Sequence, residues 1–193
     1  MRRLTALALA VTLAWPASAQ TILSEATGNW AGASKQGFTF RAQLTQNRDK
    51  ARLTIWRGMD SVPAASGDPD FDNTQIDLGA FATRQELEVF ENSDSTTLQV
   101  VTEFADEEAE GRSVVQIQFI DNQYTVVGYY HRSKFYNPGG EPFTYECDVD
   151  LWNMVSIDDG KQRQLEPVGF EALNASDWTF SAAFDRGFCT RTS

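Results

Sequence analysis

Histidine and cysteine are scarce in this chain, which contains one histidine, His131, and two cysteines. One histidine excludes a three-histidine metal site, and no Ser-His-Asp triad can form without His131. The two cysteines lack the close spacing of zinc ligands, which argues against a cysteine zinc site. No residue pattern marks a nucleophile or a cofactor loop. The sequence therefore predicts no cofactor and favours a non-enzymatic protein.

Basic residues are also few, 16 against 27 acidic residues, so the formal net charge is −11. Such a protein is repelled by nucleic acids and by anionic lipid surfaces, so neither is an expected partner. Beyond the N-terminus, no apolar run approaches the roughly 20 residues that a membrane helix needs. We therefore predict no membrane span and a soluble mature protein.

The N-terminus resembles an export signal. Arg2 and Arg3 precede an apolar run over 4–15, and Ala17-Ser18-Ala19 supplies a small-residue cleavage site. This order predicts a secretory signal peptide over residues 1–19, in preference to a membrane anchor. It leaves a single β-rich domain over 20–193 in the periplasm or outside the cell. In such an oxidising compartment Cys147 and Cys189 are expected to form a disulfide bond.

Apolar and polar residues alternate along most of the chain, which is typical of half-buried β-strands. The central hairpin, 113–132, has an Asp121-Asn122 turn, which predicts the pairs Phe119–Tyr124 and Ile117–Val126. The same register pairs residue 115 with residue 128, and residue 114 with residue 129. Gly128 has no side chain to fill a core, so it indicates a bend, a bulge or a close backbone approach.

About nine such segments follow one another, joined by turns such as Asp158-Asp159-Gly160 and by a long loop over 58–73. Trp178 and Phe184 bound the expected last strand, and one short helix is expected near 167–173. The fold class is therefore all-β, an antiparallel meander that closes into a small barrel or forms a two-sheet sandwich. Gly28-Asn29-Trp30 resembles the first strand of lipocalin-like barrels, and this resemblance implies an architecture only.

Aromatic residues after the hairpin provide the candidate binding site. Phe135 and Tyr136 lie in a glycine- and proline-rich loop over 133–142, where core packing does not account for them. Tyr129 and His131 are expected on the less apolar face of the hairpin, with His131 opposite Arg112. Together these side chains predict a recognition patch at a barrel mouth. The alternatives are that the rings seal the barrel end and that His131 is an ordinary surface residue.

Asp68, Asp70 and Asp72 alternate in the long loop and offer hard oxygen ligands for calcium. The segment lacks the glycine and glutamate that an EF-hand requires at its sixth and twelfth positions. The alternatives are a non-standard calcium site and a solvated polar loop.

Three function classes fit these patterns. The favoured one is an exported binding protein for a small-molecule ligand or a protein partner. The second is a hydrolase of envelope polymers that works through carboxylates, for which the candidates are Glu103, Asp106, Glu107, Glu108, Asp148 and Asp150. The third is a structural or assembly factor of the cell envelope.

Overall fold

The computed structural model describes residues 21–79, 81–137 and 139–190, and the predicted signal peptide lies outside this part. The described chain forms two antiparallel sheets. The four-stranded sheet has the order β1 (Ile22–Asn29), β2 (Thr39–Asn47), β3 (Lys50–Arg57) and β4 (Phe71–Leu78). The seven-stranded sheet runs sequentially through β5 (Ala82–Glu91), β6 (Thr96–Ala105), β7 (Ala109–Ile120), β8 (Gln123–Phe135), β9 (Phe143–Asp150), β10 (Val155–Asp158) and β11 (Lys161–Gln164).

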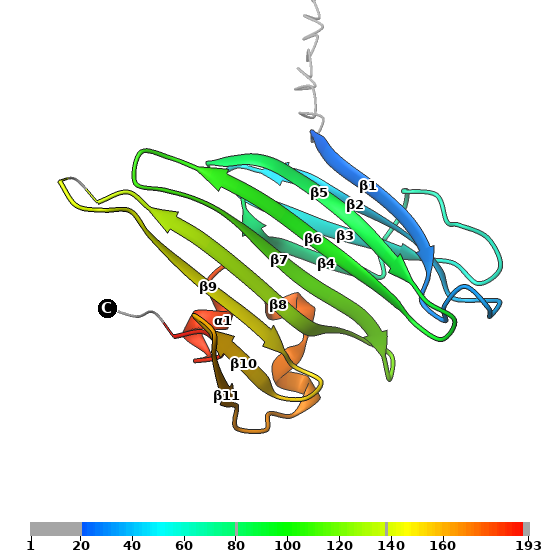
Figure 1. The fold of residues 1–193 in the computed structure, drawn as a ribbon. Coiled ribbons are helices and arrows are strands. Elements are labelled where there is room, and N and C mark those ends of the chain that lie inside the picture. The colour runs from blue at the N-terminus through cyan, green and yellow to red at the C-terminus, as the bar shows by residue number, and fades with distance from the viewer. Residues whose placement is uncertain (1–20, 80, 138, 191–193) are drawn as a thin grey trace, which may run out of the picture.

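The sequential strand order confirms the predicted meander, but the sheets do not close into a barrel (Figure 1). They lie side by side along β1 and β5, where the Leu87 amide donates to the Ser24 hydroxyl at 3.0 Å. The Asn29 amide likewise donates to the Glu91 carboxylate at 3.0 Å. The opposite edges, β4 and β11, do not pair. The two-sheet sandwich is therefore the better description, and the barrel prediction is wrong.

Short helical turns, rather than the predicted last strand, complete the layer that contains the four-stranded sheet. They are η1 (Phe170–Leu173), η2 (Ala175–Asp177) and α1 (Ala182–Asp185), drawn orange to red in Figure 1. Buried Asn73 on β4 holds this segment, because its side-chain amide donates to the carbonyls of Ala175 at 2.7 Å and Trp178 at 2.8 Å. The predicted strand from Trp178 to Phe184 is therefore wrong. Its apolar residues pack on the sheet from turns instead.

The predicted disulfide bond between Cys147 and Cys189 is present. It joins β9 to the chain just after α1, so it fastens the C-terminal segment to the seven-stranded sheet. No helix in the described ranges is long and apolar enough to span a membrane.

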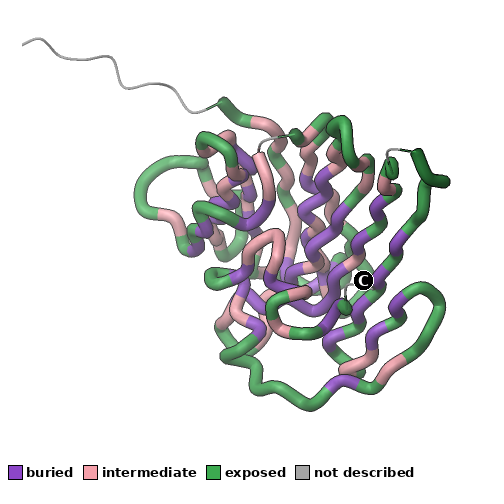
Figure 2. Tube along the Cα trace, turned by 90° about the vertical axis from the view of Figure 1, so that its left-hand side faces the viewer, coloured by how far each residue is buried: buried purple, intermediate pink, exposed green. Residues whose placement is uncertain are grey.

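The main core lies between the four-stranded sheet and β6–β8. Its fully buried side chains come from both layers and include Phe40, Leu44, Leu53, Ile55, Leu98, Val100, Val115, Ile117 and Val126. Figure 2 shows the buried residues alternating with exposed ones along the strands, as the period of two requires. We call the face of the seven-stranded sheet that carries Leu98, Ile117 and Val126 its inner face.

The central hairpin follows the predicted register only near its turn. Phe119 pairs with Tyr124 and Ile117 with Val126, as expected. Val127 then has no partner on β7, and Gln116 pairs with Gly128. This β-bulge adds one residue to β8, and a shift of one residue moves side chains to the other face.

The bulge corrects the predicted position of the residues beyond it. Tyr129 pairs with Val115, and His131 pairs with Ser113 rather than with Arg112. Both side chains are buried on the inner face instead of lying on a mixed outer face. Gly128 lies next to the bulge, as its lack of a side chain indicated. An added Cβ there would lie 2.7 Å from the Gln116 side chain.

Candidate functional site

A pocket of about 340 Å³ opens on the inner face of the seven-stranded sheet, near the end where β7 begins and β8 ends. It is lined mostly by aromatic side chains from the sheet and the C-terminal segment: Phe104, Ala109, His131, Ser133, Phe135, Phe143, Tyr145, Phe180 and Phe184. Its size and apolar lining are those of a site for one small molecule.

The alternation of β8 beyond the bulge builds one wall of the pocket from the floor to the rim. His131 and Ser133 are 5% and 2% exposed and form the floor, together with Tyr145 of the neighbouring strand β9. Phe135, two residues further on, is only partly buried, and Phe143 opposite it is 48% exposed. The pocket therefore has a polar floor and an apolar rim.

Hydrogen bonds hold the polar floor in place. The Ser133 hydroxyl lies 2.6 Å from His131 Nε2. The Tyr129 hydroxyl lies 3.4 Å from His131 Nδ1, and it also donates to the Phe180 carbonyl at 3.5 Å. Both nitrogens of the imidazole thus face a hydroxyl group, and one of these hydroxyls reaches the C-terminal segment.

The floor belongs to a row of buried polar residues that crosses the sheet. The row runs through Thr102, Ser113, His131, Cys147 and Asp158, on β6 to β10. Unpaired polar groups are costly inside a protein, so such a row needs internal partners. Because the row is polar, the inner face is chemically different here from the aliphatic core.

Asp77 of β4 meets this row from the opposite layer. Its carboxylate accepts hydrogen bonds from the Leu78 amide at 2.7 Å and from the Ser113 hydroxyl at 3.2 Å. Burial raises the pKa of Asp77 from 3.8 to about 6, although hydrogen bonds from Leu78, Thr102 and Ser113 favour the ionised form. Burial, followed by the nearby Asp77 charge, raises the pKa of the Tyr129 hydroxyl well above 10.

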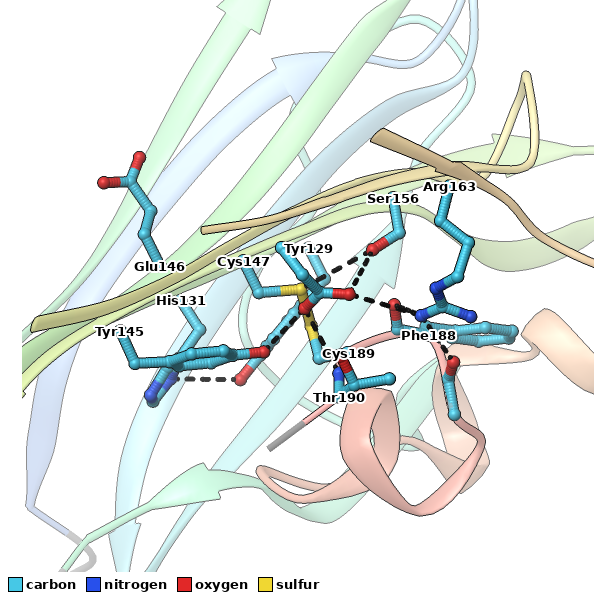
Figure 3. The surroundings of a disulfide bond; sticks show 12 residues. Tyr129, His131, Tyr145, Glu146, Cys147, Ser156, Arg163, Phe188, Cys189 and Thr190 are labelled. Atoms are coloured by element: carbon cyan, nitrogen blue, oxygen red, sulfur yellow. Dashed lines mark hydrogen bonds and ion pairs between the residues drawn. A yellow bond between two sulfur atoms is a disulfide. The ribbon is translucent and has the colours of Figure 1, made fainter. Parts of the chain in front are cut away.

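The disulfide bond between Cys147 and Cys189 lies close to Tyr145 (Figure 3). A carboxylate oxygen of Asp158 lies within 4.8 Å of both sulfur atoms. The Asp158 carboxylate accepts hydrogen bonds from the Tyr145 hydroxyl at 2.7 Å and from the Thr190 amide at 3.2 Å. Burial alone would raise the pKa of Asp158, but bonds from Tyr145, Thr190 and Arg163 lower it overall. Tyr145 is thereby fixed with its ring against the pocket.

Aromatic contacts form the remaining walls. Phe104 and Phe180 meet edge to face with ring centroids 5.9 Å apart, and His131 and Phe184 do so at 5.3 Å. The sheet thus supplies one half of the walls and the C-terminal segment the other. Such rings offer a large apolar contact area with few rotatable bonds.

The four residues predicted for binding divide between the inside and the outside of this pocket. His131 and Phe135 line it, and Tyr129 lies directly behind His131. Tyr136 lies outside, 36% exposed and 5.0 Å from the Lys134 ammonium. The alternative of a surface histidine is wrong, because His131 is buried.

Several lining residues were not predicted. Ser133 and Tyr145 reach the floor through the bulge and the alternation of β9, and Phe180 and Phe184 reach the walls through helical turns. For Phe180 and Phe184 the sequence contained one signal, the predicted disulfide bond, because it places the C-terminal segment against β9.

The three aspartates predicted for calcium do not converge on one point, and Asp72 lies on β4 rather than in the loop. Asp72 makes a two-pronged ion pair with Arg52, with both distances 2.7 Å. Asp70 pairs with Arg57 at 3.1 Å and accepts from the Tyr124 hydroxyl at 2.6 Å, while Asp68 is exposed. This arrangement lends the calcium prediction no support.

Across the described ranges, one group of three potential metal ligands lies close together: Cys147, Asp158 and Cys189. Both of its sulfur atoms are bonded to each other, so they are not thiolate ligands. The group is therefore a structural cluster at the disulfide.

The close approach of Ser133 and His131 resembles a nucleophile beside its base. Acyl transfer, however, also needs donors for the oxyanion, commonly free backbone amides. Ser133 lies in the middle of the ladder, paired with Gly111 on one side and Tyr145 on the other. The carboxylates considered for a hydrolase are not among the lining residues, and Asp148 and Asp150 are exposed.

No protein-family model, curated protein or solved structure matches this chain. The pocket itself therefore provides the basis for a function.

Proposed function

We propose that the protein is an exported, non-enzymatic binding protein that holds one small apolar ligand in the pocket above His131. The observation that carries this proposal is a pocket of about 340 Å³ that is lined mostly by aromatic side chains and has two buried polar residues, His131 and Ser133, at its floor. An open pocket of this size with aromatic walls provides a large apolar contact area for a ligand.

The disulfide bond supports the exported location, because such bonds persist in oxidising compartments. The signal-peptide pattern over residues 1–19 points to the same location. The net charge of −11 accords with a ligand that is not a nucleic acid.

Binding of a neutral apolar dye, N-phenylnaphthylamine, tests the proposal. We expect saturable fluorescence enhancement with the full mature protein, and displacement of the dye by apolar compounds. Lipid and small-molecule extraction of protein purified from an export-competent host, followed by mass spectrometry, should also release a bound compound.

A matched pair of variants locates the site. Ala109→Phe fills the rim of the pocket and should abolish the dye signal. Ala105→Phe adds the same ring at an exposed position outside the pocket and should leave the signal unchanged. Equal dye binding by both variants, or no saturable binding by the parent protein, would overturn the proposal.

A further inference from the structure

The pocket has its polar groups at the bottom and its apolar groups at the entrance, and this arrangement restricts the chemistry of a ligand. His131 and Ser133 are almost fully buried, whereas Phe143 at the rim is half exposed. A compound with one polar end gains the floor hydrogen bonds only when that end enters first. Its apolar part then lies between the rings of the rim and the walls.

The contacts of Tyr129 determine which atoms of the floor are free to accept. The Phe180 carbonyl can only accept a hydrogen bond, so the single Tyr129 hydroxyl proton points to it. With its proton directed to this carbonyl, Tyr129 accepts from His131 Nδ1, and we assign the imidazole proton to Nδ1 on this basis. In the neutral ring Nε2 is consequently an acceptor, and the Ser133 hydroxyl donates to it.

This chain of donors leaves the lone pairs of Ser133 Oγ as the acceptor on the floor. A polar group that meets this atom has to donate a hydrogen bond to it. A hydroxyl can do so, whereas an ether or a carboxylate cannot.

Charged end groups fit the lining poorly. The lining residues include no lysine, arginine, aspartate or glutamate, so a charge at the floor lacks an ion partner there.

Resting on the binding function proposed above, we infer that the ligand is an uncharged apolar alcohol, bound hydroxyl first with that group donating to Ser133 Oγ. The hydroxyl makes one hydrogen bond at the buried floor. The rings that line the pocket contact its apolar body: Phe104, Phe135, Phe143, Phe180 and Phe184.

Four probes of equal chain length test this inference by displacing N-phenylnaphthylamine: decanol, decyl methyl ether, decanoate and decylamine. We expect decanol to bind about five- to tenfold more tightly than the ether, because a neutral hydrogen bond contributes about 1 kcal/mol. Decanoate and decylamine should bind more weakly than decanol. Equal binding of decanol and the ether, or tightest binding of either charged probe, would overturn the inference.

Two serine variants assign the effect to one atom. Ser133→Ala removes the acceptor and should equalise decanol and the ether while the dye still binds. Ser113→Ala changes the neighbouring buried serine, which contacts Asp77 and does not line the pocket, and should keep the preference.

If a variant fails to fold, the parent protein's preference between decanol and the ether still tests the end-group inference. If the dye and all four probes fail to bind the parent protein, the proposed function itself is wrong; if they bind without a preference for the alcohol, only the end-group inference falls.

Discussion

The two halves of the inner face of the seven-stranded sheet are covered differently. The packed half, which includes Leu98, Ile117 and Val126, lies against a second sheet and is fully buried. The open half, which includes His131, Ser133 and Tyr145, lies against helical turns and contains the pocket. A sheet presents a regular array of side chains every second residue, so two sheets fill the space between them. Short turns present a few large rings instead, and they leave a gap that is large enough for a ligand.

The disulfide bond gives the largest expected difference between the halves. Replacing Cys147 and Cys189 together by alanine opens a loop with a sequence separation of 42 residues. Chain-entropy arithmetic predicts a loss of about 4 kcal/mol. Urea denaturation of the double variant measures this loss.

Hydrogen exchange of the double variant shows which strands and turns lose stability. We expect faster exchange in the C-terminal turns and around the pocket, with protection retained between β2, β3 and β6. Uniformly increased exchange throughout the molecule would contradict the separation into two halves.

Truncating one residue in each half compares their packing. Leu98→Ala leaves a closed cavity among fully buried neighbours and should cost about 3–4 kcal/mol. Phe180→Ala enlarges a space that already exists, so it should cost only about 1–2 kcal/mol while weakening dye binding. Thermal and chemical denaturation of both variants, with dye titration, give the result. A larger loss of stability in Phe180→Ala than in Leu98→Ala would show that the open half contributes more to folding stability than the packed half.

Asp77 lies where the layers meet beside the polar row, and it makes stability depend on pH. Its pKa is raised to about 6 in the folded protein from 3.8. Between these values the folded protein retains a proton that the unfolded chain has released, so stability falls as the pH rises through this interval. The fall amounts to up to about 3 kcal/mol, at about 1.4 kcal/mol per pH unit.

Asp77→Asn removes this titration, and the free energy of unfolding of the variant should vary less with pH between about 4 and 6.5. Urea midpoints measured across that interval give the change in stability with pH. A loss of stability that is the same at every pH does not affect this comparison. Parallel curves for the two proteins would show that Asp77 does not titrate there.

The smallest expected effect separates two adjacent aromatic residues. Tyr136→Ser changes a side chain outside the pocket and should alter stability by about 0.5 kcal/mol or less. Phe135→Ser removes a ring stacked on Phe143 at 4.9 Å, and should cost about 1–2 kcal/mol and weaken dye binding. If Tyr136→Ser lost dye binding and Phe135→Ser did not, the ligand would bind outside the pocket, at the recognition patch predicted from the sequence.

The sequence predicts the fold class and the disulfide because both depend on patterns within short stretches of chain. Alternation at β9 and the Asp159-Gly160 turn predicts strands and a hairpin directly, and the structure contains them. Export and the cysteine count predict the Cys147–Cys189 bond. The choice between barrel and sandwich depends on whether β4 meets β11, and no local pattern reports that pairing.

The pocket is less predictable because its residues depend on one extra residue and on distant contacts. Gly128 indicates an irregularity, but its neighbours do not tell which residue remains unpaired. The rings of Phe180 and Phe184 have the spacing of a strand as well as of a helical turn. Their position becomes clear only when the hydrogen bonds of Asn73 and the disulfide place that segment.

The bulge at Val127 also determines where the coding sequence can shorten without altering the pocket. Deleting the single codon for Val127 would restore an unbroken ladder with the same strand order. Beyond that point Tyr129 would keep its pair Val115 and His131 its pair Ser113, so His131 and Ser133 would stay on the inner face. The bulge is therefore a position at which β8 can lose one residue and still present the same side chains to the pocket.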